Sequence, residues 1–392
     1  MTAAPEIDRS PNISREALQA LRGDFLYCNV AGSGPTFPVA ARVAERYRDW
    51  LSSVGMFSHD GYDAYNVALD ATRADFAEFV GDAGGARRVA LTQSATDALN
   101  TLIGGLRLPA NSLVVTTAEE HGSALMPTFA RRARGDRVEV IGHRDDASFL
   151  DELRRKFDAG ARALVISLVS CKSGKVLPVR EAARLAHAQG AAVIVDCAQA
   201  AGVIPVDVDA IGGDAYAFLG YKWLHGPLGV GALWVRDLER FDVLRLGWRS
   251  QSAIDLEGNI TLKDEASRFE TGTVDAAAHV GLRQTLAVHR ALGAAVGQRL
   301  RALRAQLEER LAALPFDLLS RPEDPTGIVV AKPRGMPATE VVDAMWRDHR
   351  IVVKLLAEPR LDAIRISFWA LHSDADIDRL AAGFAKTLAA RV

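Results

Sequence analysis

The chain has 392 residues and a formal net charge of −2, so it is long enough for two domains and has no basic excess for nucleic acid or membranes. Its three cysteines lack metal-binding spacing, and no apolar run reaches transmembrane length. The first residues are polar and lack a signal-peptide core, so we expect a cytoplasmic protein without a bound metal.

The N-terminal part of the chain predicts a short helix at 14–21, followed by the glycine-rich segment Phe25–Pro35. Glycine and proline favour a turn within this segment. Apolar residues at helical spacing then predict helices over Pro38–Val54 and Ala64–Val80. The fold proper therefore begins with a turn and two helices.

The middle of the chain alternates short apolar runs with helical patterns. This alternation predicts an α/β fold with a mostly parallel sheet, whose ligands bind at the carboxyl ends of the strands. A helix is expected at Ala147–Phe157. The predicted strands are Arg88–Leu91, Ser112–Thr116, Arg137–Ile141, Ala163–Val169, Ala192–Val195 and Val230–Val235.

The C-terminal part predicts a smaller α+β domain, which the helix Ala276–Gly293 leads into. We expect an arm and opening segment at 1–45 that packs on this small domain, a large domain at 46–290 and the small domain at 291–392. The expected elements of the small domain are strands Thr326–Ala331, Ile351–Leu355 and Ile364–Ser367 and helices Ala338–His349 and Ala375–Leu388.

Lys222 stands out among the eight lysines because it lies in a turn of glycines and aromatic residues, Gly-Tyr-Lys-Trp-Leu-His-Gly-Pro. Lysine is seldom buried, and desolvation favours its neutral, nucleophilic amine. Asp196 ends the apolar run that precedes this turn. A carboxylate at a strand end is common by itself, but together with Lys222 it indicates a catalytic site.

Two other strand ends carry candidate residues. Ser94, Ala95 and Thr96 lie where a strand turns into a helix, so they form either a simple N-cap or a phosphate site built from free amide groups. His121 follows the next strand and is either part of a polar loop or a residue that faces a bound ligand.

The pattern Asp196-x-x-Gln199, followed by the turn around Lys222, resembles fold-type I pyridoxal-phosphate enzymes of aminotransferase class V. The resemblance covers about residues 25–390 and implies pyridoxal 5'-phosphate as cofactor. It implies that Lys222 holds the cofactor as a Schiff base and that Asp196 pairs with the pyridine nitrogen. Gln199 would donate to the phenolic oxygen, and His121 would stack on the ring.

The same resemblance assigns the remaining site residues. Ser94, Ala95, Thr96 and Tyr221 would bind the cofactor phosphate. Gly272 and Thr273, within Arg-Phe-Glu-Thr-Gly-Thr, would reach the phosphate of a partner subunit, which implies a homodimer with composite sites. The substrate would contact Asn29 and Ala31, with Arg365 gripping its carboxylate. The chain departs from the family pattern by carrying Leu168, Cys171 and Leu219.

The resemblance implies an enzyme that acts on an amino acid through a Cα quinonoid, with Lys222, His121 and Asp196 as its catalytic residues. We expect C–S β-elimination from cysteine or a cysteine S-conjugate, in secondary metabolism. Transamination, decarboxylation-coupled oxidative deamination and epimerisation stay open. A non-catalytic binding protein is the alternative of another class. The stretch Ile351–Ile364, where persulfide-forming desulfurases carry their cysteine, has none.

Overall fold

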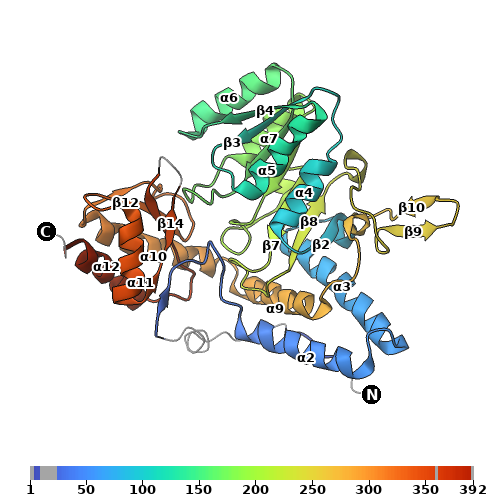
Figure 1. The fold of residues 1–392 in the computed structure, drawn as a ribbon, viewed down its shortest axis with the longest axis horizontal. Helices are drawn as coiled ribbons and strands as arrows, with labels where there is room; N and C mark the ends of the chain where they lie inside the picture. Colours follow the sequence, from blue (N-terminus) through green and yellow to red (C-terminus); the bar gives the residue numbers. More distant parts are fainter. Residues whose placement is uncertain (1–3, 9–23, 358–360, 390–392) are drawn as a thin grey trace.

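The structure, a computed structural model, describes residues 4–8, 24–357 and 361–389. A large lobe is built on a seven-stranded sheet, and a C-terminal lobe is built on a four-stranded sheet (Figure 1). The helix predicted at 14–21 lies outside the described residues.

The sheet of the large lobe has the strand order β2-β8-β7-β6-β5-β3-β4. Strands β4, β3, β5, β6 and β7 are parallel to one another, whereas β8 is antiparallel to both β7 and β2. The predicted α/β fold with a mostly parallel sheet is therefore confirmed. The strands are β2 Val89–Thr92, β3 Leu113–Thr117, β4 Arg137–Ile141, β5 Ala161–Ser167, β6 Ala192–Asp196, β7 Ala215–Leu219 and β8 Gly231–Val235.

Helices cover both faces of this sheet. Val193 and Val195 of β6 belong to the same core as α3, α6, α7 and α9, whereas Ala192 and Ile194 pack with α4 and α5. A strand covered on both faces is apolar throughout, which explains the uninterrupted run. The helices are α2 Pro38–Val54, α3 His59–Phe79, α4 Ala95–Gly105, α5 Gly122–Ala130, α6 Asp146–Asp158, α7 Val179–Ala188, α8 Val208–Ile211 and α9 Ala276–Leu292.

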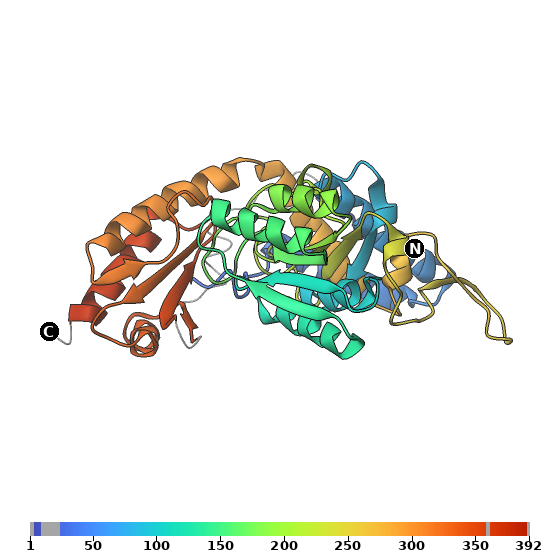
Figure 2. The ribbon, with the colours of Figure 1, turned by 90° about the horizontal axis from the view of Figure 1, so that it is seen from above.

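The C-terminal lobe has an antiparallel sheet of order β11-β12-β15-β14. Its core is continuous with one of the two main cores of the large lobe, and the long helix α10 follows α9 across the top of the molecule (Figure 2). Its elements are α10 Ala295–Ala312, β11 Phe316–Leu318, β12 Ile328–Pro333, α11 Ala338–His349, β14 Lys354–Leu356, β15 Ala363–Ser367 and α12 Asp374–Ala389.

The opening segment of the chain packs on the C-terminal lobe. Strand β1, Leu26–Tyr27, pairs in parallel with β13, Ile351–Val352, and Asn29 forms an isolated bridge with Ser367. The expected packing of residues 1–45 on the small domain and the boundaries at 45 and 290 stay predictions. None of the described helices is both long and apolar enough to cross a membrane.

Some elements differ from their predicted form. The strand expected at Ile351–Leu355 is two strands, because β13 pairs with β1 while β14 pairs with β15. Helix α3 begins five residues before the predicted Ala64, since Ser58 Oγ caps it by accepting from the Gly61 amide at 3.1 Å. The hairpin of β9, Gln251–Ile254, and β10, Ile260–Leu262, was not predicted and projects away from the body (Figure 2).

Candidate active site

A cavity of about 690 Å³ lies at the carboxyl ends of the parallel strands, between the two lobes. The large lobe supplies most of its wall, and β14 and β15 close the opposite side. Of the predicted site residues, the cavity brings together Ala31, Ser94, Ala95, Thr96, His121, Asp196, Gln199, Tyr221, Lys222 and Arg365. Asn29, Gly272 and Thr273 are not among its lining residues.

Lys222 lies in the turn that follows β7 and points its side chain into this cavity. The turn is fixed from outside, because the Gly34 amide donates to the Tyr221 carbonyl at 2.8 Å. A Cβ at Gly34 would lie 2.0 Å from the Lys222 carbonyl oxygen, so only glycine fits there. Burial lowers the pKa of Lys222, although the charge of Asp196 opposes the shift. The amine is therefore held closer to its nucleophilic form.

Asp196 is the last residue of β6 and is buried in the floor of the cavity. Its Oδ1 accepts from the Ala198 amide at 2.8 Å, and no ion pair involves it among the described residues. Burial raises the pKa of this carboxyl group. A cation that pairs with it would lower that pKa and recover part of the cost of burial.

The N-terminus of α4 provides a site for an anion. Ser94 Oγ caps the helix by accepting from the Asp97 amide at 3.1 Å, and the first-turn residues Ala95 and Thr96 line the cavity. Thr96 Oγ1 lies 2.7 Å from Ser123 Oγ, so two hydroxyl groups meet at the same place. Free amides, hydroxyls and the helix dipole together suit a phosphate group.

His121 forms the N-cap of α5. Its Nδ1 accepts from the Ser123 amide at 3.1 Å, which places the proton of the neutral ring on Nε2. Burial, and next the charge of Lys222, lowers the pKa of His121, so the ring is mainly neutral at pH 7. A neutral imidazole fixed in one tautomer is suited to stacking on a flat ligand.

Gln199 connects two sides of the site. Its Nε2 donates to the Ala31 carbonyl at 3.0 Å, and its Oε1 accepts from the Trp223 indole at 2.7 Å. It therefore ties the opening segment to the turn that carries Lys222. One N–H of its amide is left for a ligand, which is compatible with the predicted contact to a phenolic oxygen.

Arg365 lies on β15 and is buried in the wall opposite Asp196. Its Nη1 donates to the Cys171 carbonyl at 2.8 Å, and its Nη2 lies 3.4 Å from Asn29 Oδ1. Its Nε is buried without a hydrogen-bond partner, and no carboxylate pairs with it among the described residues. Burial lowers the pKa of this guanidinium group, because the charged form loses its contact with water. A bound carboxylate would stabilise the charged form, so the site favours a ligand with a carboxylate.

The sequence profile of the family Aminotransferase class-V matches residues 27–380. The chain belongs to aminotransferase class V. Members of this family are pyridoxal-phosphate-dependent enzymes, and pyridoxal 5'-phosphate is the cofactor of this class V enzyme.

Curated relatives of the class V enzyme include cysteine desulfurases. A probable cysteine desulfurase of Methanothermobacter thermautotrophicus is 31% identical over 270 residues, which are 66% of this chain and 65% of that protein. The alignment thus spans slightly less than two thirds of that relative. A cysteine desulfurase of Klebsiella pneumoniae is 29% identical over 361 residues, which are 88% of each protein.

Solved structures confirm the fold-type I architecture of the class V enzyme. The apo cysteine desulfurase of Thermococcus onnurineus NA1 has a TM-score of 0.88 at 22% identity, covering 97% of this chain and 99% of that one. A cystine C–S lyase in complex with its product cysteine persulfide has a TM-score of 0.86 at 24% identity, covering 93% and 98%.

The cavity of the class V enzyme fits its cofactor on the chemistry of its own side chains. The α4 N-terminus suits the phosphate, and the buried carboxyl group of Asp196 suits a protonated ring nitrogen. Lys222 offers an amine for the aldehyde carbon. Among the described residues, no group of three or more histidine, cysteine, aspartate or glutamate side chains is placed to hold a metal.

Glu120 is a buried residue of the class V enzyme that the sequence analysis did not single out. Its Oε1 accepts from Thr117 Oγ1 and from the Ser167 amide, both at 2.8 Å, and its Oε2 accepts from Ser167 Oγ at 2.5 Å. Burial raises the pKa of Glu120 to about 7. Ser167 lies beside Asp196 in the sheet, so Glu120 supports the floor from below. The sequence signal that could have indicated Glu120 is its position directly before His121, a predicted site residue.

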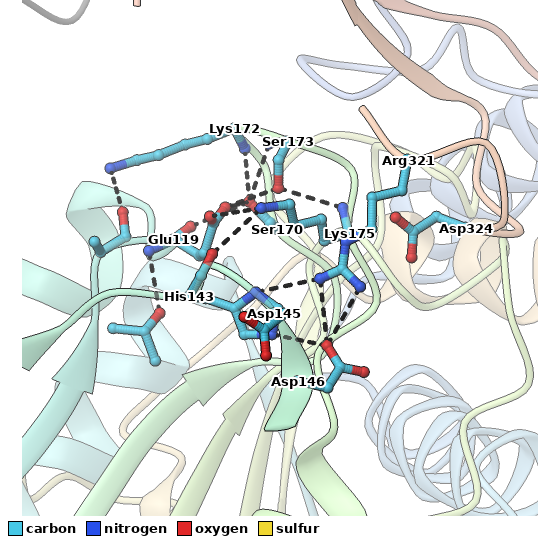
Figure 3. Close-up of polar contacts among 12 residues, drawn as sticks. Glu119, His143, Asp145, Asp146, Ser170, Lys172, Ser173, Lys175, Arg321 and Asp324 are labelled. Atoms are coloured by element: carbon cyan, nitrogen blue, oxygen red, sulfur yellow. Dashed lines mark hydrogen bonds and ion pairs between the residues drawn. The ribbon is translucent and has the colours of Figure 1, made fainter. Parts of the chain in front are cut away.

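The turn Ser170–Val176, which carries Cys171, is fastened to the large lobe by Glu119 (Figure 3). Glu119 Oε2 accepts from Ser170 Oγ at 2.5 Å and from Ser173 Oγ at 2.8 Å. Lys175 Nζ lies 3.8 Å from Glu119 Oε1. The carboxylate of Glu119 therefore interacts with residues of this turn.

The same turn is fastened to the C-terminal lobe on its other side. Asp324 Oδ1 accepts from the Val176 amide at 2.9 Å, and Thr326 Oγ1 donates to the Gly174 carbonyl at 3.0 Å. Gly174 has a φ of +74°, and a Cβ there would lie 2.8 Å from Ile328 Cβ. Only glycine allows so close an approach, so the turn acts as a connection between the lobes.

Gly272 and Thr273 lie in the segment before α9 of the class V enzyme, away from the cavity formed by one chain. The segment is anchored by a buried ion pair in which Arg73 Nη2 lies 2.6 Å from Glu270 Oε2. Thr273 itself is exposed. Its role toward a partner subunit stays a prediction.

Proposed function

We propose that this class V enzyme cleaves the C–S bond of cysteine or a cysteine S-conjugate by β-elimination. The observation that carries the proposal is the placement of a buried, uncompensated Arg365 across one cavity from Lys222 and Asp196. This arrangement suits an amino acid held by its carboxylate with its Cα near Lys222. The names of the relatives, cysteine desulfurase and cystine C–S lyase, support a sulfur-containing substrate.

The residues divide the work of this reaction. When bound, pyridoxal phosphate withdraws electrons from the bonds at the substrate Cα. Lys222 Nζ holds the cofactor and then accepts the Cα proton, because its burial favours the neutral amine. His121 keeps the cofactor plane in place, and Asp196 holds the proton on the pyridine nitrogen. Arg365 orients the substrate through its carboxylate.

The overall reaction is balanced without an oxidant. The C–S bond breaks with loss of the Cα proton, and the sulfur leaves as a thiol that takes up a proton. The aminoacrylate that remains adds water and yields pyruvate and ammonium. Transamination would instead transfer the amino group to a 2-keto acid.

The cysteines of the chain favour elimination over transfer of sulfur to the protein. All three are buried and outside any disulfide, and burial raises the pKa of Cys171 to about 11 and that of Cys197 well above its ordinary value. A protonated thiol is a poor nucleophile. The low number of cysteines, three in 392 residues, supports the expected cytoplasmic location.

The test is to supply the holoenzyme with cystine or S-methylcysteine, with and without a 2-keto acid. We expect pyruvate and ammonium in equal amounts, independent of the keto acid. Alanine formed together with a persulfide on Cys28, Cys171 or Cys197 would overturn the proposal, as would amino transfer to the keto acid.

We also propose a homodimer in which Thr273 completes the partner's phosphate site. The support is a group of exposed apolar side chains near this segment and on the hairpin β9–β10, where Trp248 is 73% exposed and Leu256 fully so. Exposed apolar surface of this kind indicates a protein interface.

A further inference from the structure

Lys354 is the residue of the cavity wall that the proposed reaction does not use. It lies on β14 directly opposite Arg365 on β15, and both residues line the cavity. Side chains of directly opposed residues project from the same face of a sheet, with Cβ atoms about 5 Å apart. The ammonium group of Lys354 is therefore on the same side of the site as the guanidinium group that is expected to hold the substrate carboxylate.

Among the described residues, no acidic side chain forms an ion pair with Lys354, which is exposed. Of the described residues that line the cavity, Asp196 alone is acidic, and it lies on the floor of the large lobe. The nearby Glu119 accepts from serine hydroxyls (Figure 3). Glu120 accepts from a threonine and a serine hydroxyl.

Another lysine of the cavity wall already has partners. Lys172 also lines the cavity from the opposite wall, with its Nζ donating to the carbonyl of Ala118 at 2.9 Å. The charges of Lys172 and Arg365 both act on His121 and help to lower its pKa, after burial and Lys222. Among the described residues that line the cavity, Lys354 therefore remains available for an anion once Arg365 is assigned to the α-carboxylate.

We infer that the preferred substrate carries a second anionic group, on its sulfur substituent, which pairs with Lys354. The inference rests on the proposed C–S cleavage and adds the substrate class, an S-conjugate of cysteine with a terminal carboxylate. An ion pair at a solvent-exposed wall contributes little, so a preference of about fivefold over a neutral substituent is expected. Lys354 acts here as a specificity residue and leaves the bond-breaking chemistry to Lys222.

Two substrates of equal size test this inference, S-(2-carboxyethyl)-L-cysteine and its neutral amide S-(2-carbamoylethyl)-L-cysteine. We expect the holoenzyme to favour the carboxylate about fivefold in kcat/KM and to lose this preference as salt is raised. Lys354→Met should remove the preference by lowering kcat/KM for the carboxylate to about the value for the amide. Lys386→Met, which removes an exposed lysine on α12, is the matched control and should keep it.

A binding measurement separates the failure of this inference from that of the proposed function. The α-methyl analogues of both substrates lack the Cα proton, so calorimetry measures their binding to the holoenzyme without reaction. Equal dissociation constants for the two analogues, or an unchanged preference in Lys354→Met, would overturn the inference even if pyruvate is formed. Tighter binding of the carboxylate without pyruvate formation would overturn C–S cleavage and support the role of Lys354.

Discussion

Lys222 and Asp196 show how burial sets the chemistry of single residues. Burial lowers the pKa of the lysine and raises that of the aspartate, so each group is moved toward its neutral form. Burying each group costs free energy, and a bound cofactor offsets this cost. It forms a covalent bond with Lys222 and a charge pair with Asp196. The site is therefore prepared for a ligand that engages both groups.

The first prediction concerns the covalent attachment. Borohydride reduction of the holoenzyme should fix the cofactor on Lys222, and peptide mass mapping should find it there alone. Lys222→Ala should lose the visible absorption of the lysine-bound cofactor and nearly all turnover, because the buried amine that holds the cofactor is removed. Lys263→Ala is the control, and cofactor found on Lys263 or another lysine would contradict the assignment.

The second prediction concerns Glu120, whose pKa is raised from 4.5 to about 7. The folded state binds its proton more tightly than the unfolded state. Its contribution to stability is therefore fully present below pH 4.5 and is lost as the pH rises through 7. The change is about 3 kcal/mol at most.

Urea unfolding of the wild type and Glu120→Gln at pH 4.5 and pH 7.5 measures this change. The glutamine keeps the shape and does not titrate, so the variant should lose less stability between the two pH values. Glu309→Gln, on the exposed side of α10, should behave like the wild type. Identical pH dependence in Glu120→Gln would show that Glu120 does not titrate in this range.

At the scale of elements, the turn Ser170–Val176 couples the two lobes, because it is hydrogen-bonded to Glu119 on one side and to Asp324 and Thr326 on the other. It also presents the Cys171 carbonyl that positions Arg365. A disturbance of this turn should therefore affect substrate binding more than cofactor binding.

The third prediction tests this coupling with Thr326→Val, which leaves the buried Gly174 carbonyl without its donor. We expect a loss of about 1 kcal/mol in the free energy of unfolding and a raised KM for the amino acid. Cofactor affinity should change little. Thr326→Ser retains the hydroxyl and serves as the control. A variant with unchanged KM would show that the turn does not position Arg365.

The sequence predicted best those elements whose pattern is local. Helix α2 and strand β4 have the predicted bounds, since their apolar spacing matches their burial. The site at the strand ends was predicted because Lys222, Asp196 and Arg365 belong to recognisable motifs. The break between β13 and β14 was not predicted, because it depends on pairing with strands β1 and β15 elsewhere in the chain. Glu120 was missed for the same reason, since its main partner is Ser167.

At the scale of the whole molecule, the fourth prediction concerns the composite site. Lys222→Ala and Thr273→Ala should each be inactive at limiting cofactor. Mixed under conditions that exchange subunits, they should recover about a quarter of wild-type activity, because half of the dimers are mixed and one of the two sites in each is intact. Sedimentation should give twice the mass of one chain. A fully active monomer, or no recovery on mixing, would contradict the shared site.

The pairing of β1 with β13 has a consequence for biosynthesis. Leu26 leaves the ribosome early, but its partner Ile351 is added 325 residues later. At cellular rates of synthesis the strand waits roughly 15 to 65 seconds for its partner. During this time the large lobe has its lysine and its phosphate cradle, while the wall with Lys354 and Arg365 has yet to be made. A nascent chain therefore acquires the groups that hold the cofactor before those that select the amino acid.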